Sequence, residues 1–153
     1  MLEWSNLLSL LFVKLADYTS GNAIKIIYLD CGQKCDLDKF LDEIEKSRPN
    51  EYNQLTSLLD KTAEYGPVWN NYRTKRLQGN HAQPICEFCG RKEARIFWFA
   101  DENNDKIIVC THGFVGRGKH DHRTEIDKAQ IRRNLYYEHK RNTQSPGRKK
   151  LGS

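Results

Sequence analysis

The chemically richest stretch of the chain is residues 111–125, THGFVGRGKHDHRTE, which holds three histidines, two arginines and one lysine. Imidazole groups transfer protons readily because their reference pKa, about 6.5, lies near neutrality. Guanidinium and ammonium groups bind phosphate oxygens. The stretch is therefore suited to metal binding, proton transfer or phosphate binding, and the alternative is a solvated loop before a helix.

Cleavage of RNA without a metal ion is one reaction that these residue types could carry out. It requires deprotonation of the 2′-hydroxyl, cationic stabilisation of the phosphorane, and protonation of the leaving 5′-oxygen on nucleotides held in line. Arg117 and Lys119 could stabilise the phosphate charge, and His120 or His122 could act as general acid or base. A glycine-rich loop with incidental histidines is the competing interpretation.

The distribution of charge points to a polyanionic partner. Residues 1–110 carry 14 basic and 16 acidic side chains, whereas residues 111–153 carry 11 basic and four acidic ones. Such an excess at one end favours nucleic acid, with a solubilising basic tail as the alternative. No run of eighteen apolar residues and no signal peptide are found, which predicts a cytoplasmic protein without a membrane partner.

The five cysteines raise the question of a zinc site. Their odd number without a secretion signal indicates reduced thiols. The spacings Cys31-x3-Cys35 and Cys86-x2-Cys89 resemble chelating pairs. If residues 85–89 form a strand, however, Cys86 and Cys89 face opposite sides of it, and only a turn after Cys89 would bring them together. We therefore expect no cofactor, and a zinc-stabilised binding domain remains an alternative.

The elements that must position these residues follow from apolar periodicity and turn signals. Helices are expected over residues 3–18, from Asp36 to the break at Pro49, over 51–65 and over 124–139; strands are expected over 23–29, 85–88, 94–100 and 106–110. This order predicts an α+β fold in which a helical hairpin packs on a small antiparallel sheet, with an extra N-terminal and a C-terminal helix. Residues 1–20 form the helical extension, 21–141 the domain, and 142–153 a basic, disordered tail.

Several short pieces occur in a characteristic order: "IIYLD", "DLDKFLDEI", "AEYG", "KRLQGN", "ICEFC", "ARIFWF", "IIVCTHGF", a basic loop and "TEIDKAQIRR". Over residues 23–137 the chain thereby resembles the RelE/ParE toxin superfamily, in particular the phage-derived HigB-like branch of type II toxin–antitoxin systems. The resemblance implies a RelE-like fold, a metal-independent endoribonuclease (mRNA interferase) acting on mRNA, often at the ribosome, and a cognate antitoxin. Since some relatives poison DNA gyrase instead, a non-catalytic nucleic-acid- or gyrase-binding protein is the alternative.

The resemblance also assigns residues. Arg95 matches the strand arginine that contacts the scissile phosphate, its alternative role being a surface ion pair. The basic cluster of relatives falls on Arg117, Lys119, His120 and His122. Two departures weaken the match. Relatives carry two adjacent lysines after the Gly-Phe pair, where this chain has VGR (residues 115–117), and often an arginine at the position of Cys89.

Further expectations concern flanking residues. Four cations near the strands are expected to bind the RNA backbone, or else to be ordinary surface charges: Lys75, Arg76, Arg91 and Lys92. Glu87 is either a general base or, preferably, the ion-pair partner of Arg95, and His112 is expected to be structural. The wide apolar face of the helix expected over 3–18 predicts docking on its own domain, on a second copy as a homodimer, or on an antitoxin.

Overall fold

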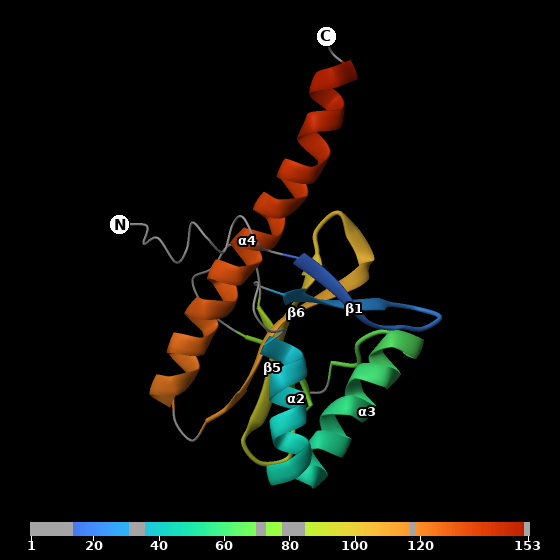
Figure 1. Cartoon of the computed structure of the whole chain (residues 1–153). Coiled ribbons are helices and arrows are strands. Elements are labelled where there is room, and N and C mark those ends of the chain that lie inside the picture. Colours follow the sequence, from blue (N-terminus) through green and yellow to red (C-terminus); the bar gives the residue numbers. More distant parts are fainter. Residues whose placement is uncertain (1–13, 31–35, 70–72, 78–84, 117–118, 152–153) are drawn as a thin grey trace.

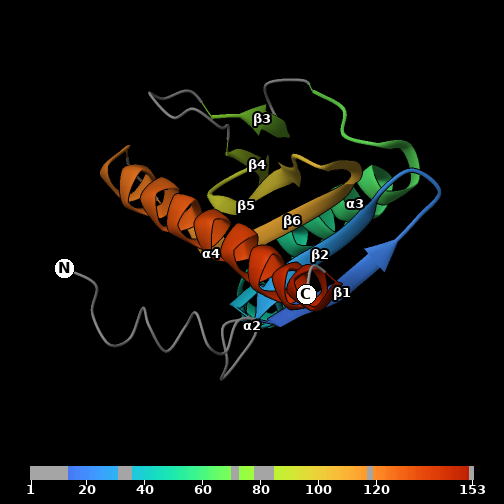
Figure 2. The same ribbon diagram turned by 90° about the horizontal axis from the view of Figure 1, so that it is seen from above.

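A six-stranded sheet lies between two helical layers. The structure, a computed structural model, describes residues 14–30, 36–69, 73–77, 85–116 and 119–151, of which residues 36, 119–121 and 144–151 are described as backbone only. The strand order is β1-β2-β6-β5-β4-β3. One face of the sheet is covered by the pair α2 and α3, and the other by α4 (Figures 1 and 2).

The element bounds place two strands before the helical pair. The strands are β1 (Lys14–Ser20), β2 (Lys25–Asp30), β3 (Thr74–Arg76), β4 (Cys86–Cys89), β5 (Ala94–Asp101) and β6 (Asn104–Val115); the helices are α2 (Asp36–Ser47), α3 (Pro49–Tyr65) and α4 (Lys119–Leu151). The α+β class and the helical hairpin are as predicted. No helix in the described part of the chain is long and apolar enough to cross a membrane.

The sheet is mixed, whereas the sequence predicted an antiparallel one. β2 pairs with β6 in parallel, from Lys25 opposite Ile107 to Tyr28 opposite Cys110, and all other pairs are antiparallel. The reason lies in the course of the chain after β2. α3 ends beside the start of β2, where the N–H groups of Ala23 and Ile24 donate to the carbonyl of Ala63. β3 runs opposite to β2, and the three reversals from β3 to β6 therefore leave β6 parallel to β2.

The expected helix over residues 3–18 is wrong for residues 14–18, which belong to β1; residues 1–13 lie outside the described part. Side chains in this strand alternate. Ala16 and Tyr18 pack on the core beneath α2 and α3, whereas Leu15 and Asp17 are exposed. The turn after β1 requires glycine, because a Cβ on Gly21 would lie 2.5 Å from the backbone carbon of Ala63 in α3.

The α2–α3 layer holds the larger core. Pro49 stands at the start of α3, where its missing N–H costs nothing, so it ends one helix and begins the next. Apolar side chains of both helices meet the near face of β2, β4, β5 and β6. The largest fully buried members on this side are Ile26, Leu37, Ile44, Leu55, Leu59, Phe88, Ile96 and Trp98.

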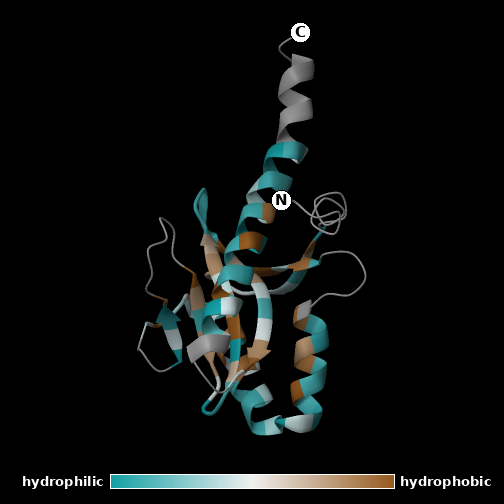
Figure 3. Ribbon diagram, turned by 90° about the vertical axis from the view of Figure 1, so that its left-hand side faces the viewer, coloured by the Kyte–Doolittle hydropathy of each residue, from teal (hydrophilic) through white to brown (hydrophobic). Residues whose placement is uncertain are grey.

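The C-terminal region is more regular than predicted. β6 continues to Val115, so THGFV is strand rather than loop, and α4 begins at Lys119 rather than Thr124. α4 also runs through residues 142–151, where a disordered tail was expected. Ala129 and Tyr136 of α4 pack against Phe97, Phe99 and the other apolar residues of the second core. Beyond the sheet the helix projects away from the domain, and its described part there is mostly hydrophilic (Figures 1 and 3).

Candidate functional site

The pairing register lines up four side chains across four strands. Lys75 on β3 is opposite Glu87 on β4, Glu87 is opposite Phe97 on β5, and Phe97 is opposite His112 on β6. Opposed residues lie on the same face of a sheet. Phe97 belongs to the core beneath α4, so this row, which joins a cation, a carboxylate, an aromatic ring and an imidazole, lies on the α4 face.

Glu87 and His122 form the centre of the site. Glu87 is only 3% exposed, and its Oε2 lies 3.5 Å from Nε2 of His122, in the first turns of α4. That oxygen has no hydrogen-bond partner in the described part of the chain. The His122 ring meets Phe97 and Phe114 edge-on, with centroids 6.3 and 6.0 Å away. A buried carboxylate beside an imidazole is an arrangement suited to proton transfer. The expected pairing of Glu87 with Arg95 is wrong, because α4 supplies the partner instead.

Arg95 lies one row further along the same face, opposite Cys89 and Phe114. Its Nη1 donates to the carbonyl oxygens of Ala94 at 2.9 Å and Gly90 at 3.4 Å. Its Nε–H is buried and has no hydrogen-bond partner among the described residues. A buried donor without an acceptor costs about 1–3 kcal/mol, so this guanidinium group would gain from an anionic oxygen.

His112 is a structural residue, as the sequence predicted. Its Nε2 lies 2.9 Å from Oε2 of Glu125, its Nδ1 lies 3.1 Å from Oγ1 of Thr111, and its ring stacks on Phe97 at 5.0 Å. Burial and the nearby Arg132 lower the pKa of His112 to about 4, against the raising effect of Glu125. The imidazole is therefore neutral at pH 7 and unsuited to phosphate binding.

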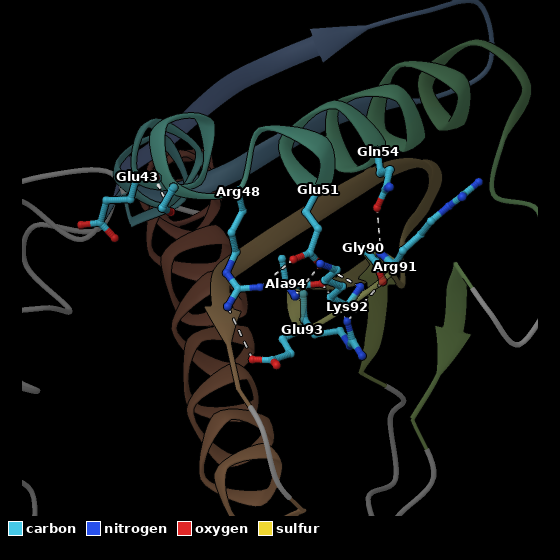
Figure 4. Close-up of polar contacts among 11 residues, drawn as sticks. Glu43, Arg48, Glu51, Gln54, Gly90, Arg91, Lys92, Glu93 and Ala94 are labelled. Atoms are coloured by element: carbon cyan, nitrogen blue, oxygen red, sulfur yellow. Dashed lines mark hydrogen bonds and ion pairs between the residues drawn. The ribbon is translucent and has the colours of Figure 1, made fainter.

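Glu51 of α3 holds the turn between β4 and β5 (Figure 4). Its Oε2 accepts the backbone N–H groups of Lys92 at 3.1 Å and Ala94 at 2.9 Å, and its Oε1 accepts Nη1 of Arg48 at 2.9 Å. Gln54 accepts the N–H of Arg91 at 2.8 Å. Burial alone would raise the pKa of Glu51, but these hydrogen bonds outweigh it and lower the pKa. The turn backbone is thus fixed, while the side chains of Arg91 and Lys92 are exposed.

Arg91, Lys92 and Arg95 lie at one end of the sheet. The N–H of Gly116 donates to the carbonyl of Glu93 at 3.3 Å, so the basic segment that follows β6 begins beside the turn of Arg91 and Lys92. Arg95 contacts the same turn through Gly90. Arg117 lies outside the described residues, as do the side chains of Lys119 and His120, whose backbone forms the start of α4.

Lys75 and Arg76, both predicted to bind RNA, lie on opposite faces of β3. Lys75 lies on the α4 face beside Glu87, whereas Arg76 is opposite Cys86 on the other face. There its guanidinium group lies 5.3 Å from the centroid of Trp69, which stacks on Trp98. Strand alternation therefore brings Lys75 to the site and leaves Arg76 away from it.

Sequence reasoning missed the role of Glu51. The available signal was its spacing, since Glu51 precedes Leu55 by four residues on the buried stripe of α3. A carboxylate at such a position needs buried donors. No comparable local signal pairs Glu87 with His122, because they meet only through tertiary packing.

No metal site is found in the described part of the chain, where no three His, Cys, Asp or Glu side chains gather. Cys86 belongs to the core beneath α2 and α3, and Cys89 lies on the α4 face, opposite Arg95. Burial raises the pKa of these thiols to about 11 and about 12, so both are neutral. Cys31 and Cys35 lie outside the described residues.

The chain matches no protein-family model, and no curated protein sequence matches it.

Proposed function

We propose that the chain is the toxin of a type II toxin–antitoxin module and a metal-independent endoribonuclease that cleaves mRNA. The observation that carries the proposal is the Glu87–His122 pair beside Arg95 at the basic end of one sheet face. The pieces that carry the resemblance to RelE-like toxins occur in the order strand, two helices, three strands and helix, and the elements from β2 to α4 differ from this order by the additional short strand β3. RNA, on or off the ribosome, and a cognate antitoxin are the proposed partners.

In the proposed reaction the 2′-oxygen attacks the phosphorus, the bond to the 5′-oxygen breaks, and a 2′,3′-cyclic phosphate and a 5′-hydroxyl form. Nε2 of His122 faces the carboxylate of Glu87, which can orient the ring and leaves Nδ1 to take the proton of the 2′-hydroxyl. The leaving 5′-oxygen then takes a proton from His122 or from His120. Arg95 is proposed to stabilise the charge of the phosphate through its guanidinium group. Arg117, Lys119 and His120 are proposed as further members of the site.

Departures from the family pattern favour a second candidate, a nucleic-acid- or gyrase-binding protein without cleavage activity. Cys89, whose thiol is neutral, stands beside Arg95 where relatives often carry an arginine. Gly116 occupies one of the two positions where relatives have lysines. Both changes remove positive charge that would stabilise the phosphorane.

The test is to express the chain with and without the protein encoded beside its gene and to map RNA ends by primer extension. Purified protein is then incubated with RNA, with and without ribosomes. Arg95→Gln, His122→Asn and Glu87→Gln should each lower the cleavage rate, by about 10²–10⁴ for the proton-transfer residue. His139→Asn, the same change elsewhere on α4, should leave the rate unaltered. Absence of growth arrest and of cleavage under all conditions would exclude the nuclease, and RNA binding with a steep salt dependence but no cleavage would support the second candidate.

A further inference from the structure

A broad depression of about 860 Å³ lies between the first turns of α3 and the turn at residues 90–93. Three cations line it, Arg48, Arg91 and Lys92, together with the amide side chains of Asn50, Asn53 and Gln54. Figure 4 shows Arg48, Glu51 and Gln54 descending from the helices toward the turn that carries Arg91 and Lys92. We call this depression the α3 groove.

The lining of the α3 groove indicates the chemistry of its ligand. Pockets for drug-like molecules are lined mainly by apolar and aromatic side chains. Among the described residues that line the α3 groove, Pro49 is the one apolar residue. The carboxylate of Glu51 does not oppose an anion, because it is 4% exposed and bonded to Arg48 and to backbone N–H groups. A hydrophilic, anionic ligand with hydrogen-bonding edges therefore fits best.

The turn at residues 90–93 lies between the α3 groove and the proposed nuclease site, which is on the α4 face. The turn that forms one wall contacts Arg95 through the carbonyl of Gly90, at 3.4 Å, and contacts Gly116 through the carbonyl of Glu93, at 3.3 Å. A strand of RNA that leaves Arg95 and passes over this turn would meet the exposed side chains of Arg91 and Lys92.

We propose that the α3 groove binds the single-stranded RNA that flanks the scissile phosphate, an inference that rests on the proposed function. Arg91 and Lys92 contact backbone phosphates, and the amides of Asn50 and Asn53 contact base or sugar edges. Since Glu51 and Gln54 fix the backbone of the turn, the backbone positions of Arg91 and Lys92 are set before RNA arrives, and only their side chains lose freedom on binding.

The test uses the full chain and RNA made uncleavable by 2′-O-methyl groups, with oligonucleotides of about 16 nucleotides read by fluorescence anisotropy. Arg91→Gln combined with Lys92→Gln should weaken binding on the order of tenfold. It should also reduce the slope of log K against log salt by about 1.4, since each cation on a single strand contributes about 0.7. Asn53→Glu should weaken binding as well. Lys61→Gln, an exposed cation further along α3, is the matched control and should change neither quantity.

Cleavage kinetics provide a second readout. Because the α3 groove does not touch the reacting atoms, the double variant should raise KM for long RNA and leave kcat unchanged. Thermal unfolding checks the fold, since both substitutions keep the backbone N–H groups that Glu51 and Gln54 accept.

The outcomes separate the two proposals. Wild-type affinity and salt slope in the double variant would overturn the α3 groove as an RNA site, even if the protein cleaves RNA. The same holds if the double variant loses only the binding of an antitoxin. Binding through the groove without any cleavage would reject the nuclease and retain the groove. Absence of RNA binding by the wild-type protein would reject both.

Discussion

At the scale of single residues, the carboxylate of Glu51 is a buried charge that accepts three hydrogen bonds. It joins α3 to the β4–β5 turn through the N–H groups of Lys92 and Ala94 and through Arg48. Because hydrogen bonding lowers its pKa below the ordinary 4.5, the charged form favours the folded state. This contribution is complete above the unfolded pKa and is lost as pH falls through the folded one.

Glu51→Gln should therefore reduce the free energy of unfolding at pH 7 by about 1–3 kcal/mol, because an amide nitrogen replaces a buried acceptor. The difference from wild type should shrink when both proteins are unfolded with urea well below pH 4.5. Asp42→Asn, an exposed carboxylate on α2, serves as control and should cost little at either pH. A loss that is equal at both pH values would show that the charge of Glu51 is unimportant.

His112 predicts a second pH effect, in a different range. Its pKa is lowered from 6.5 to about 4, mainly by burial, so the unfolded chain takes up a proton between these values and the folded protein does not. Stability is therefore complete above about pH 6.5 and falls as pH approaches 4, by on the order of 2–3 kcal/mol for this residue. Urea titrations across this range should show a shallower decline for His112→Gln than for wild type. Parallel curves would contradict the prediction.

The roles of some residues could be predicted from the sequence, but the side chains that they contact could not. The structural role of His112 was predicted from local pattern, and the place of Arg95 at the start of a sheet strand follows from its position in ARIFWF, although the residue is part-buried rather than at the surface. The Glu87–His122 pair depends on the register of β4 against β5 and on where α4 crosses the sheet, and neither is encoded in the residues around Glu87. The sequence of residues 90–93 likewise could not show that Glu51 and Gln54 of α3 fix the backbone of this turn.

At the scale of elements, α4 is fastened at the far end of β5. The buried Asp101 accepts hydrogen bonds from the hydroxyl of Tyr136, from Nζ of Lys140 and from the N–H of Asn103. These bonds lower the pKa of Asp101 although burial opposes them. Since His122 is carried by the same helix, this fastening also helps to hold the proposed proton-transfer residue over the sheet.

Tyr136→Phe removes one of these donors and leaves the rest of the packing in place. A hydrogen bond to a charged group contributes about 1.5–3 kcal/mol, and the free energy of unfolding should fall by that amount. Limited proteolysis should also cut α4 faster. Tyr137→Phe is the control. Its hydroxyl accepts the exposed N–H of Glu102, at 2.9 Å, and does not bond to a buried charge, so its loss should cost less than that of the Tyr136 hydroxyl. Equal costs would show that the Asp101 cluster does not fasten the helix.

The order of helices and strands from residue 23 onward was largely predictable, because long amphipathic segments such as α2 and aromatic strands such as β5 have strong local patterns. β1 was not, because the apolar run at residues 7–13 suggested a helical face that extended through residue 18. Residues 14–18 form a strand because their backbone pairs with β2, and this pairing depends on residues outside the segment itself. The start of α4 at Lys119 was not predicted, because the glycines at positions 113, 116 and 118 indicate a loop.

At the scale of the whole molecule, charge is divided between the two helical layers. Residues 36–65, which span α2 and α3, contain eight acidic and four basic side chains, whereas α4 contains ten basic and four acidic ones. The sequence predicted the excess at one end of the chain. The fold converts it into two opposite faces, with the basic layer on the side of Glu87 and Arg95. Such a division orients a polyanion toward that side before contact.

Removing residues 144–153 tests how far this basic layer extends, because it deletes Arg148, Lys149 and Lys150 while α4 keeps its contacts through Lys140. The salt slope of RNA binding should fall by about 0.7 for each of these cations that contacts a phosphate, or about 2 for all three. The urea midpoint should not move. Substituting Arg148, Lys149 and Lys150 together by Gln tests whether the effect comes from their charge or from the shorter helix. An unchanged salt slope would show that bound RNA lies closer to the sheet.

The parallel pairing of β2 with β6 has a consequence for how the protein is made. Residues 25–28 find their central partners only in residues 107–110, so the β1–β2 hairpin and the α2–α3 pair are synthesised long before the strand that completes their core. Such distant pairing slows folding and exposes apolar surface while the chain is incomplete. Because Arg95 and Glu87 also depend on β6 and α4, we expect a nascent chain to lack the assembled form of the proposed nuclease site. If the chain is a nuclease, a cell would then be exposed to its activity only after residues 104–151 have been synthesised.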